Sequence, residues 1–89
     1  MPQELKALTS ELIRAARALL RWEQRDLSEA SSVSLPTVKR LEAKQGVLGA
    51  HRSTIALLQR ALEQAGIEFI GENGGGPGVR LRKSLQKGE

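Results

Sequence analysis

Apolar residues recur at helical spacing near the start of the chain. Between Thr9 and Trp22 they fall every three or four positions, which predicts an amphipathic helix with Thr9 or Ser10 as its N-cap. Leu5 and Leu8 continue the stripe backwards, so the residues before Thr9 are expected either to add a helical turn or to fray. The expected buried stripe consists of Leu12, Ile13, Ala16, Leu19 and Leu20.

A short polar stretch then separates two further helices, predicted from Gln24 to Ser31 and from Leu35 to Ala43. Ser34 can accept a hydrogen bond from the open N–H groups of the new helix, and Pro36 suits a first turn because it has no N–H to leave unpaired. Val33 is costly to expose, so we expect it to fill the corner between the two helices. The earlier helix is expected to bury Leu27, Ala30 and Ser31.

The last third of the chain changes its period. A fourth helix is predicted from Thr54 to Ala65, with Ser53 as its cap and Gly66 as its stop. Ile67–Ile70 and Val79–Arg82 are short β-prone runs joined by a glycine-rich turn, which favours a β-hairpin over a disordered linker with a basic tail. The apolar face of the fourth helix is expected to hold Ile55, Leu58, Ala61, Leu62 and Ala65.

Composition favours a small helical domain. The 89 residues suit a single core, and this core must be aliphatic because Trp22 and Phe69 are the only aromatic residues. The absence of cysteine excludes a disulfide scaffold and a thiolate metal site. Charges throughout the first residues leave no long apolar run, so we expect a soluble cytoplasmic protein with no membrane partner.

The net charge of +4 is concentrated at one end of the chain. Residues 1–20 and 21–44 each carry +1, residues 45–78 carry −1, and residues 79–89 carry +3. A basic tail attracts polyanions in general, and it equally suits a tail that only keeps the protein soluble.

The third helix places its charges on one side. At about 100° per residue, Val38 and Leu41 point together and form its expected buried side. The opposite side holds Pro36, Lys39, Arg40 and Ala43, and the flanks hold Leu35, Thr37 and Glu42. Two helices joined by a tight turn, the second with exposed donors, have the geometry that fits a major groove. There arginine suits guanine, lysine suits guanine or a phosphate, and leucine or threonine methyl groups suit a thymine methyl.

The stretch QRDLSEASSVSLPTVKRLEAKQG, residues 24–46, resembles the helix-turn-helix core of Cro and phage-repressor (XRE) type DNA-binding regulators. LIRAARALLRW, residues 12–22, is similar to the first helix of that family, and the resemblance covers residues 10–65. It implies a mostly α, four- to five-helix lambda-repressor-like domain over residues 1–66. The β-prone runs and the terminal charges predict a β-hairpin and basic tail over residues 67–89, outside the resemblance. The positions that match are Gln24, Leu27, Val33, Ser34, Thr37, Val38, Leu41 and Glu42.

The resemblance also implies the residues that contact DNA. Gln24 is expected to meet a phosphate or a base edge, and Lys44 a phosphate. Residues expected to read bases are Leu35, Pro36 and Arg40, and those expected to touch the backbone or neighbouring bases are Ser34, Thr37 and Lys39. Arg17 and Glu42 are similar to an ion pair that locks the first helix to the third.

Three positions depart from the family pattern. Ser32 replaces the turn glycine, so a left-handed backbone there is strained or the turn is altered, and Ser28 replaces an alanine. Lys44 stands near the position of a glycine in the pattern, so the sequence does not determine the backbone geometry with which the chain leaves the third helix. Because Leu35 and Pro36 have no side-chain donors, base reading is expected to depend on Arg40, Lys39 and DNA shape.

The expected function is a sequence-specific transcriptional regulator of double-stranded DNA, a repressor that acts as a homodimer on a pseudo-palindromic operator. The hairpin, the fourth helix or the N-terminal turn can supply the dimer surface. Two alternatives stay open: an antitoxin whose tail binds a toxin or another protein partner, and a protein-interaction module that does not bind DNA. His51 is the only histidine and lacks partners for catalysis or metal binding, so no enzyme, cofactor or metal is expected. No small-molecule ligand is expected either, because no second domain is predicted that could hold an effector pocket.

Overall fold

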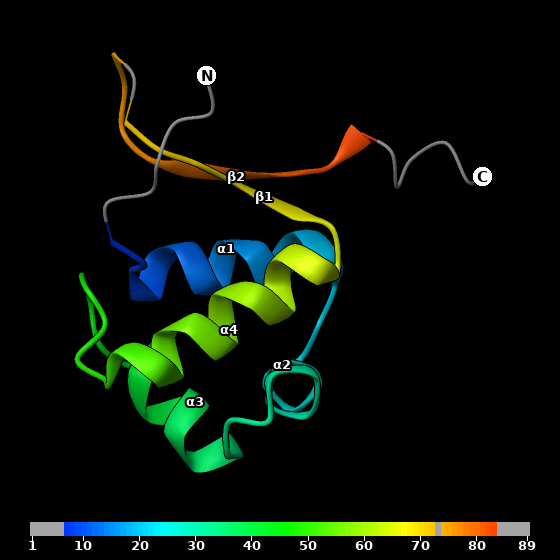
Figure 1. Ribbon diagram of the computed structural model, residues 1–89, viewed down its shortest axis with the longest axis vertical. Coiled ribbons are helices and arrows are strands. Elements are labelled where there is room, and N and C mark those ends of the chain that lie inside the picture. The colour runs from blue at the N-terminus through cyan, green and yellow to red at the C-terminus, as the bar shows by residue number, and fades with distance from the viewer. Residues whose placement is uncertain (1–6, 73, 84–89) are drawn as a thin grey trace.

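The computed structural model describes residues 7–72 and 74–83, and over these ranges the chain forms four helices followed by an antiparallel hairpin (Figure 1). Helices α1 and α4 form the middle of the molecule, the hairpin lies on one side of them, and α2 and α3 lie on the other (Figure 1). The mostly helical fold and the hairpin are therefore confirmed. The elements are α1 (Ser10–Leu20), α2 (Gln24–Ser31), α3 (Leu35–Glu42), α4 (Arg52–Gln64), β1 (Ile67–Ile70) and β2 (Gly78–Leu81).

The core is aliphatic, as predicted, and every helix contributes to it. Trp22 and Phe69 pack only against its margin. Two residues expected inside lie outside: the side chain of Leu19 is on the open side of α1, where the residue is 40% exposed, and Ala30 is exposed on α2. The buried members are Leu8, Leu12, Ile13, Ala16, Leu27, Val33, Val38, Leu41, Leu48, Leu58, Ala61, Leu62 and Ile67.

Helix starts follow the predicted caps in two cases and not in a third. Thr9 Oγ1 accepts the Leu12 N–H at 3.1 Å, and Ser34 Oγ accepts the Thr37 N–H at 3.3 Å. The prediction that Ser53 caps the fourth helix is wrong, because α4 begins at Arg52 with an N-cap that makes no side-chain bond. There the carbonyl of the preceding residue, His51, accepts the Ile55 N–H at 3.0 Å, so the first turn closes through the main chain alone.

The turn between α2 and α3 keeps a left-handed residue although glycine is absent. Ser32 has φ 66° and ψ 16°, and its N–H donates to the Ser28 carbonyl at 2.9 Å. The neighbouring hydroxyls hold Val33 from both sides: Ser28 Oγ donates to its carbonyl at 2.6 Å, and Ser31 Oγ accepts its N–H at 3.1 Å. Val33 is buried in the corner, as predicted, so the turn is fixed and the strain is local to Ser32.

Replacing Ser32 with glycine is expected to raise the free energy of unfolding by about 0.5–1 kcal/mol. A side chain in the left-handed region costs about 1–2 kcal/mol, and the greater freedom of glycine in the unfolded chain cancels about half of that gain. Ser53→Gly, the same exchange inside the first turn of α4, should instead destabilise the protein. Urea unfolding of both variants checks this, and a loss of stability in Ser32→Gly would contradict it.

The hairpin shares the helical core. Strands β1 and β2 pair so that Ile67 faces Leu81 and Phe69 faces Val79, and these four side chains pack inward. β2 begins one residue earlier than predicted, at Gly78, and Arg82 lies beyond it with its guanidinium donating to the Glu63 carbonyl at 3.0 Å. Removing the hairpin would therefore take Ile67, which is fully buried, out of the core.

Candidate nucleic-acid interface

Helix α3 is anchored by two aliphatic side chains and presents a cationic outer face. Val38 and Leu41 are 1% and 2% exposed, which confirms the predicted buried side. The residues of the opposite side, Pro36, Lys39, Arg40 and Ala43, are all exposed, and Leu35 and Thr37 on the flanks are half-buried. Among residues 7–72 and 74–83, neither Lys39 nor Arg40 forms an ion pair, so both side chains are available to an anion outside the chain.

A buried carboxylate fixes the angle between the helices. Glu42 was expected on a flank of the third helix, yet its side chain is only 3% exposed, because α1 and α2 both reach it. Arg17 of α1 binds it through two parallel bonds, Nε to Oε2 at 2.7 Å and Nη2 to Oε1 at 2.6 Å. Gln24 of α2 donates its amide nitrogen to Oε1 at 3.0 Å. The ion pair implied by the family resemblance is thus present, and one carboxylate joins three helices.

The same guanidinium also ties the chain between α1 and α2, because Arg17 Nη1 donates to the Trp22 carbonyl at 2.8 Å. The hydrogen bonds to Glu42 raise the pKa of Arg17, since they favour its charged form. A bidentate arginine holds a carboxylate in one orientation more strictly than a lysine could. The position of α3 against α1 and α2 is therefore determined by directional bonds as well as by packing.

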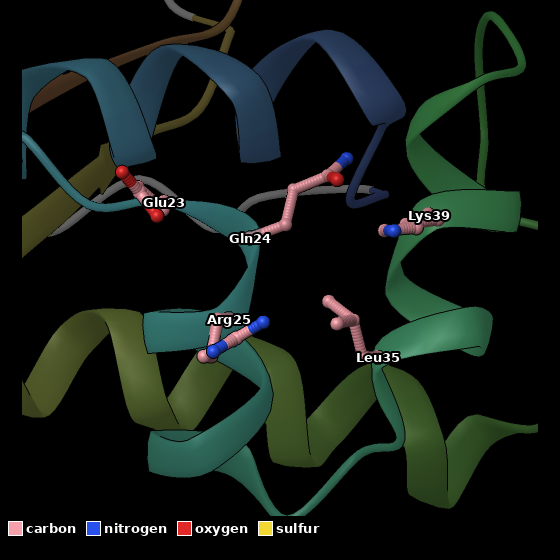
Figure 2. Close-up of a pocket in the computed structure, with 5 residues that line it drawn as sticks. All are labelled: Glu23, Gln24, Arg25, Leu35 and Lys39. Atoms are coloured by element: carbon pink, nitrogen blue, oxygen red, sulfur yellow. The ribbon is translucent and has the colours of Figure 1, made fainter.

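The N-terminus of α2 and the outer side of α3 enclose an open cavity of about 210 Å³ (Figure 2). Figure 2 shows Leu35 and Lys39 projecting from α3 toward Gln24 and Arg25 on α2, with Glu23 at the far end. Three predicted site residues, Gln24, Leu35 and Lys39, are thus brought together. Arg25 and Glu23 were not predicted, and the only signal in the sequence was their adjacency to Gln24.

The other predicted site residues do not line this cavity. Ser34 and Thr37 are at the start of α3, and Ser34 Oγ donates to Thr37 Oγ1 at 2.9 Å, so their hydroxyls serve the helix cap. Pro36 and Arg40 are on the neighbouring exposed surface of α3. Lys44 is exposed just past the end of α3, where its carbonyl accepts a hydrogen bond from Arg14 Nη1 at 3.3 Å.

The exit from α3 is held by α1. Gly46 has φ 84°, and its N–H donates to both carboxylate oxygens of Glu11, at 3.1 and 3.3 Å. The N–H of Glu11 itself and that of Gly46 lower the pKa of this carboxylate. Gly46 also accepts the Ser10 N–H at 2.9 Å, so the segment after Lys44 is attached to the start of α1.

Two acidic residues, Glu23 and Asp26, lie at the start of α2. The Glu23 N–H donates to Asp26 Oδ2 at 2.7 Å, which supplies an anion at the start of α2 from within the chain. An external anion is therefore better placed beside Lys39 than at the first N–H groups of α2.

No group of three or more histidine, cysteine, aspartate or glutamate residues that could hold a metal ion is found within the part of the chain described. None of the described helices is long and apolar enough to cross a membrane. No protein-family model matches the chain, and the comparison with curated proteins finds no match.

Proposed function

We propose that this protein is a sequence-specific regulator of double-stranded DNA, in which α2, the Ser32 turn and α3 form a helix-turn-helix of the lambda-repressor-like kind. One observation carries the proposal: a short helix fixed by Val38, Leu41 and the Glu42 network exposes a face with two available cations. An exposed helix of this size fits the major groove, where side chains can reach base edges.

The residues of this face then take distinct roles. Arg40 can form two hydrogen bonds to guanine O6 and N7, and Lys39 can donate to guanine or to a phosphate. Gln24 Nε2 uses one hydrogen for Glu42 and keeps a second for a phosphate. Lys44, at the end of α3, adds a further phosphate contact, and Pro36 contacts the groove without donating a bond.

A repressor that acts by occupying its site needs two copies of such a helix. One short helix reads only a few base pairs, and a symmetric pair on a pseudo-palindromic site doubles the sequence that is read. The hairpin lies on the side of α1 and α4 that faces away from α3 (Figure 1). Pairing of two chains through the hairpin would therefore turn the two copies of α3 away from each other, so a dimer that reads one duplex needs a surface nearer to α3.

Selection of duplexes from random DNA tests the function. We expect one pseudo-palindromic sequence to be enriched and to bind two chains, with at least about 10³-fold preference over random competitor at fixed near-physiological salt. Affinity should fall steeply as salt rises, because phosphate contacts release counterions. Failure to enrich any sequence would overturn the proposal and favour a protein-interaction module.

A further inference from the structure

The cavity between α2 and α3 combines chemistries that a plain phosphate site does not need. Arg25, Lys39 and the Gln24 amide offer donors, while Leu35 forms an apolar wall and is half-buried. Figure 2 shows the Leu35 side chain directed into this space rather than into the core. A ligand that fills the cavity should therefore carry an apolar group next to an anionic one.

Leu35 limits which base edge can face it. An apolar side chain pressed against a base N–H or carbonyl would leave that group without a hydrogen-bond partner, which weakens binding. Among the four bases, only thymine presents a methyl group in the major groove, at C5. This methyl lies at the outer edge of the base, toward the backbone of its own strand, so an apolar contact and a phosphate contact can be made side by side.

The charges around the cavity assign the position of the phosphate. Lys39 follows Leu35 by about one turn of α3, so both border the cavity, and Arg25 faces them from α2 (Figure 2). Glu23 is at the opposite end, where its carboxylate would repel a phosphate. The anionic part of the ligand thus belongs beside Lys39 and Arg25, next to the apolar wall.

We propose, on the basis of the DNA-binding function above, that this cavity holds a thymidine unit of each half-site: Leu35 contacts the thymine methyl, and Lys39 with Arg25 contacts the adjoining backbone phosphate. Each half-site then contains one thymine that is read by its methyl group alone. Arg40, outside the cavity, reads a neighbouring base pair.

Deoxyuridine, which lacks only the methyl group, tests this in the selected duplex. Each thymine of the selected duplex would be replaced in turn, and the affinity of the wild type, of Leu35→Ala and of Leu57→Ala for each duplex would be measured. Leu57 is a matched control because it is an exposed leucine on α4, away from the cavity. Burial of one methyl group contributes about 0.8 kcal/mol, so the wild type should lose about fourfold in affinity at one thymine of each half-site.

The variants decide whether Leu35 is the residue that reads the methyl. Leu57→Ala should show the same loss of about fourfold, whereas Leu35→Ala should bind the thymine and deoxyuridine duplexes equally. An unchanged wild-type affinity at every thymine, or a loss that persists in Leu35→Ala, would overturn this inference while specific DNA binding stands. If selection enriches no sequence, the proposed function itself fails and the inference fails with it.

Discussion

Replacing Arg17 with alanine is expected to lower the free energy of unfolding by about 3–5 kcal/mol. The Glu42 carboxylate is 3% exposed, and Arg17 supplies two of the three hydrogen bonds to its oxygens. Without the guanidinium, a buried charge would keep only the Gln24 amide as its partner. A loss of this size is a large part of the stability of a small domain, so urea unfolding followed by circular dichroism would detect it readily.

Two further variants show whether the uncompensated charge is the cause. Arg17→Met combined with Glu42→Leu removes both charges and fills the space with apolar groups, so it should regain most of the lost stability. Arg80→Ala breaks an ion pair of the hairpin that is open to solvent, and it should change stability far less than Arg17→Ala. A similar small effect for Arg17→Ala and Arg80→Ala would contradict the role of the buried pair.

The helix boundaries that could be predicted from the sequence are those set by local chemistry. Thr9 and Ser34 cap their helices through bonds to residues three positions ahead, and such bonds depend on almost nothing else in the fold. The predicted start of α4 was wrong because its N-cap is His51, whose side chain makes no cap bond, although Ser53 offered a suitable hydroxyl two residues later. A helix that begins without a side-chain cap leaves no local signal of its first residue in the sequence.

Burial was predictable only where the helix period determines it. Val38 and Leu41 are buried for that reason. Leu19 belongs to the apolar stripe predicted for α1. No described element covers its side of α1 fully, so the residue is 40% exposed. Glu42 shows the opposite case, since it is buried by contacts from α1 and α2 that no local pattern contains.

Most of the candidate site was predictable as positions on one helix, and Gln24 of α2 was predicted from the family resemblance alone. The outer face of α3 follows from the positions of its two buried anchors. The cavity could not be predicted in this way, because its other wall comes from α2. The position of that wall depends on the angle between the helices that the Glu42 network imposes. Arg25 and Glu23 therefore became visible as site residues only in three dimensions.

Arg40 should carry the largest share of sequence reading. It is exposed on α3 and forms no ion pair with the described residues, so binding to DNA breaks no existing partnership. A bidentate contact between arginine and guanine contributes about 1–3 kcal/mol of discrimination, which corresponds to about 5–150-fold in affinity. Alanine at this position should weaken binding to the selected sequence by that amount and relax the preference at one base pair of each half-site.

The most direct test compares Arg40→Ala with Arg60→Ala. Both remove one exposed arginine, and Arg60 lies on α4, so the change in net charge is the same. Affinity for the selected duplex and for random duplex is measured at one fixed salt concentration. We expect Arg40→Ala to lose about 5–150-fold on the selected duplex and far less on random DNA, while Arg60→Ala stays close to the wild type on both. Equal losses for the two variants, on both duplexes, would contradict groove reading by α3.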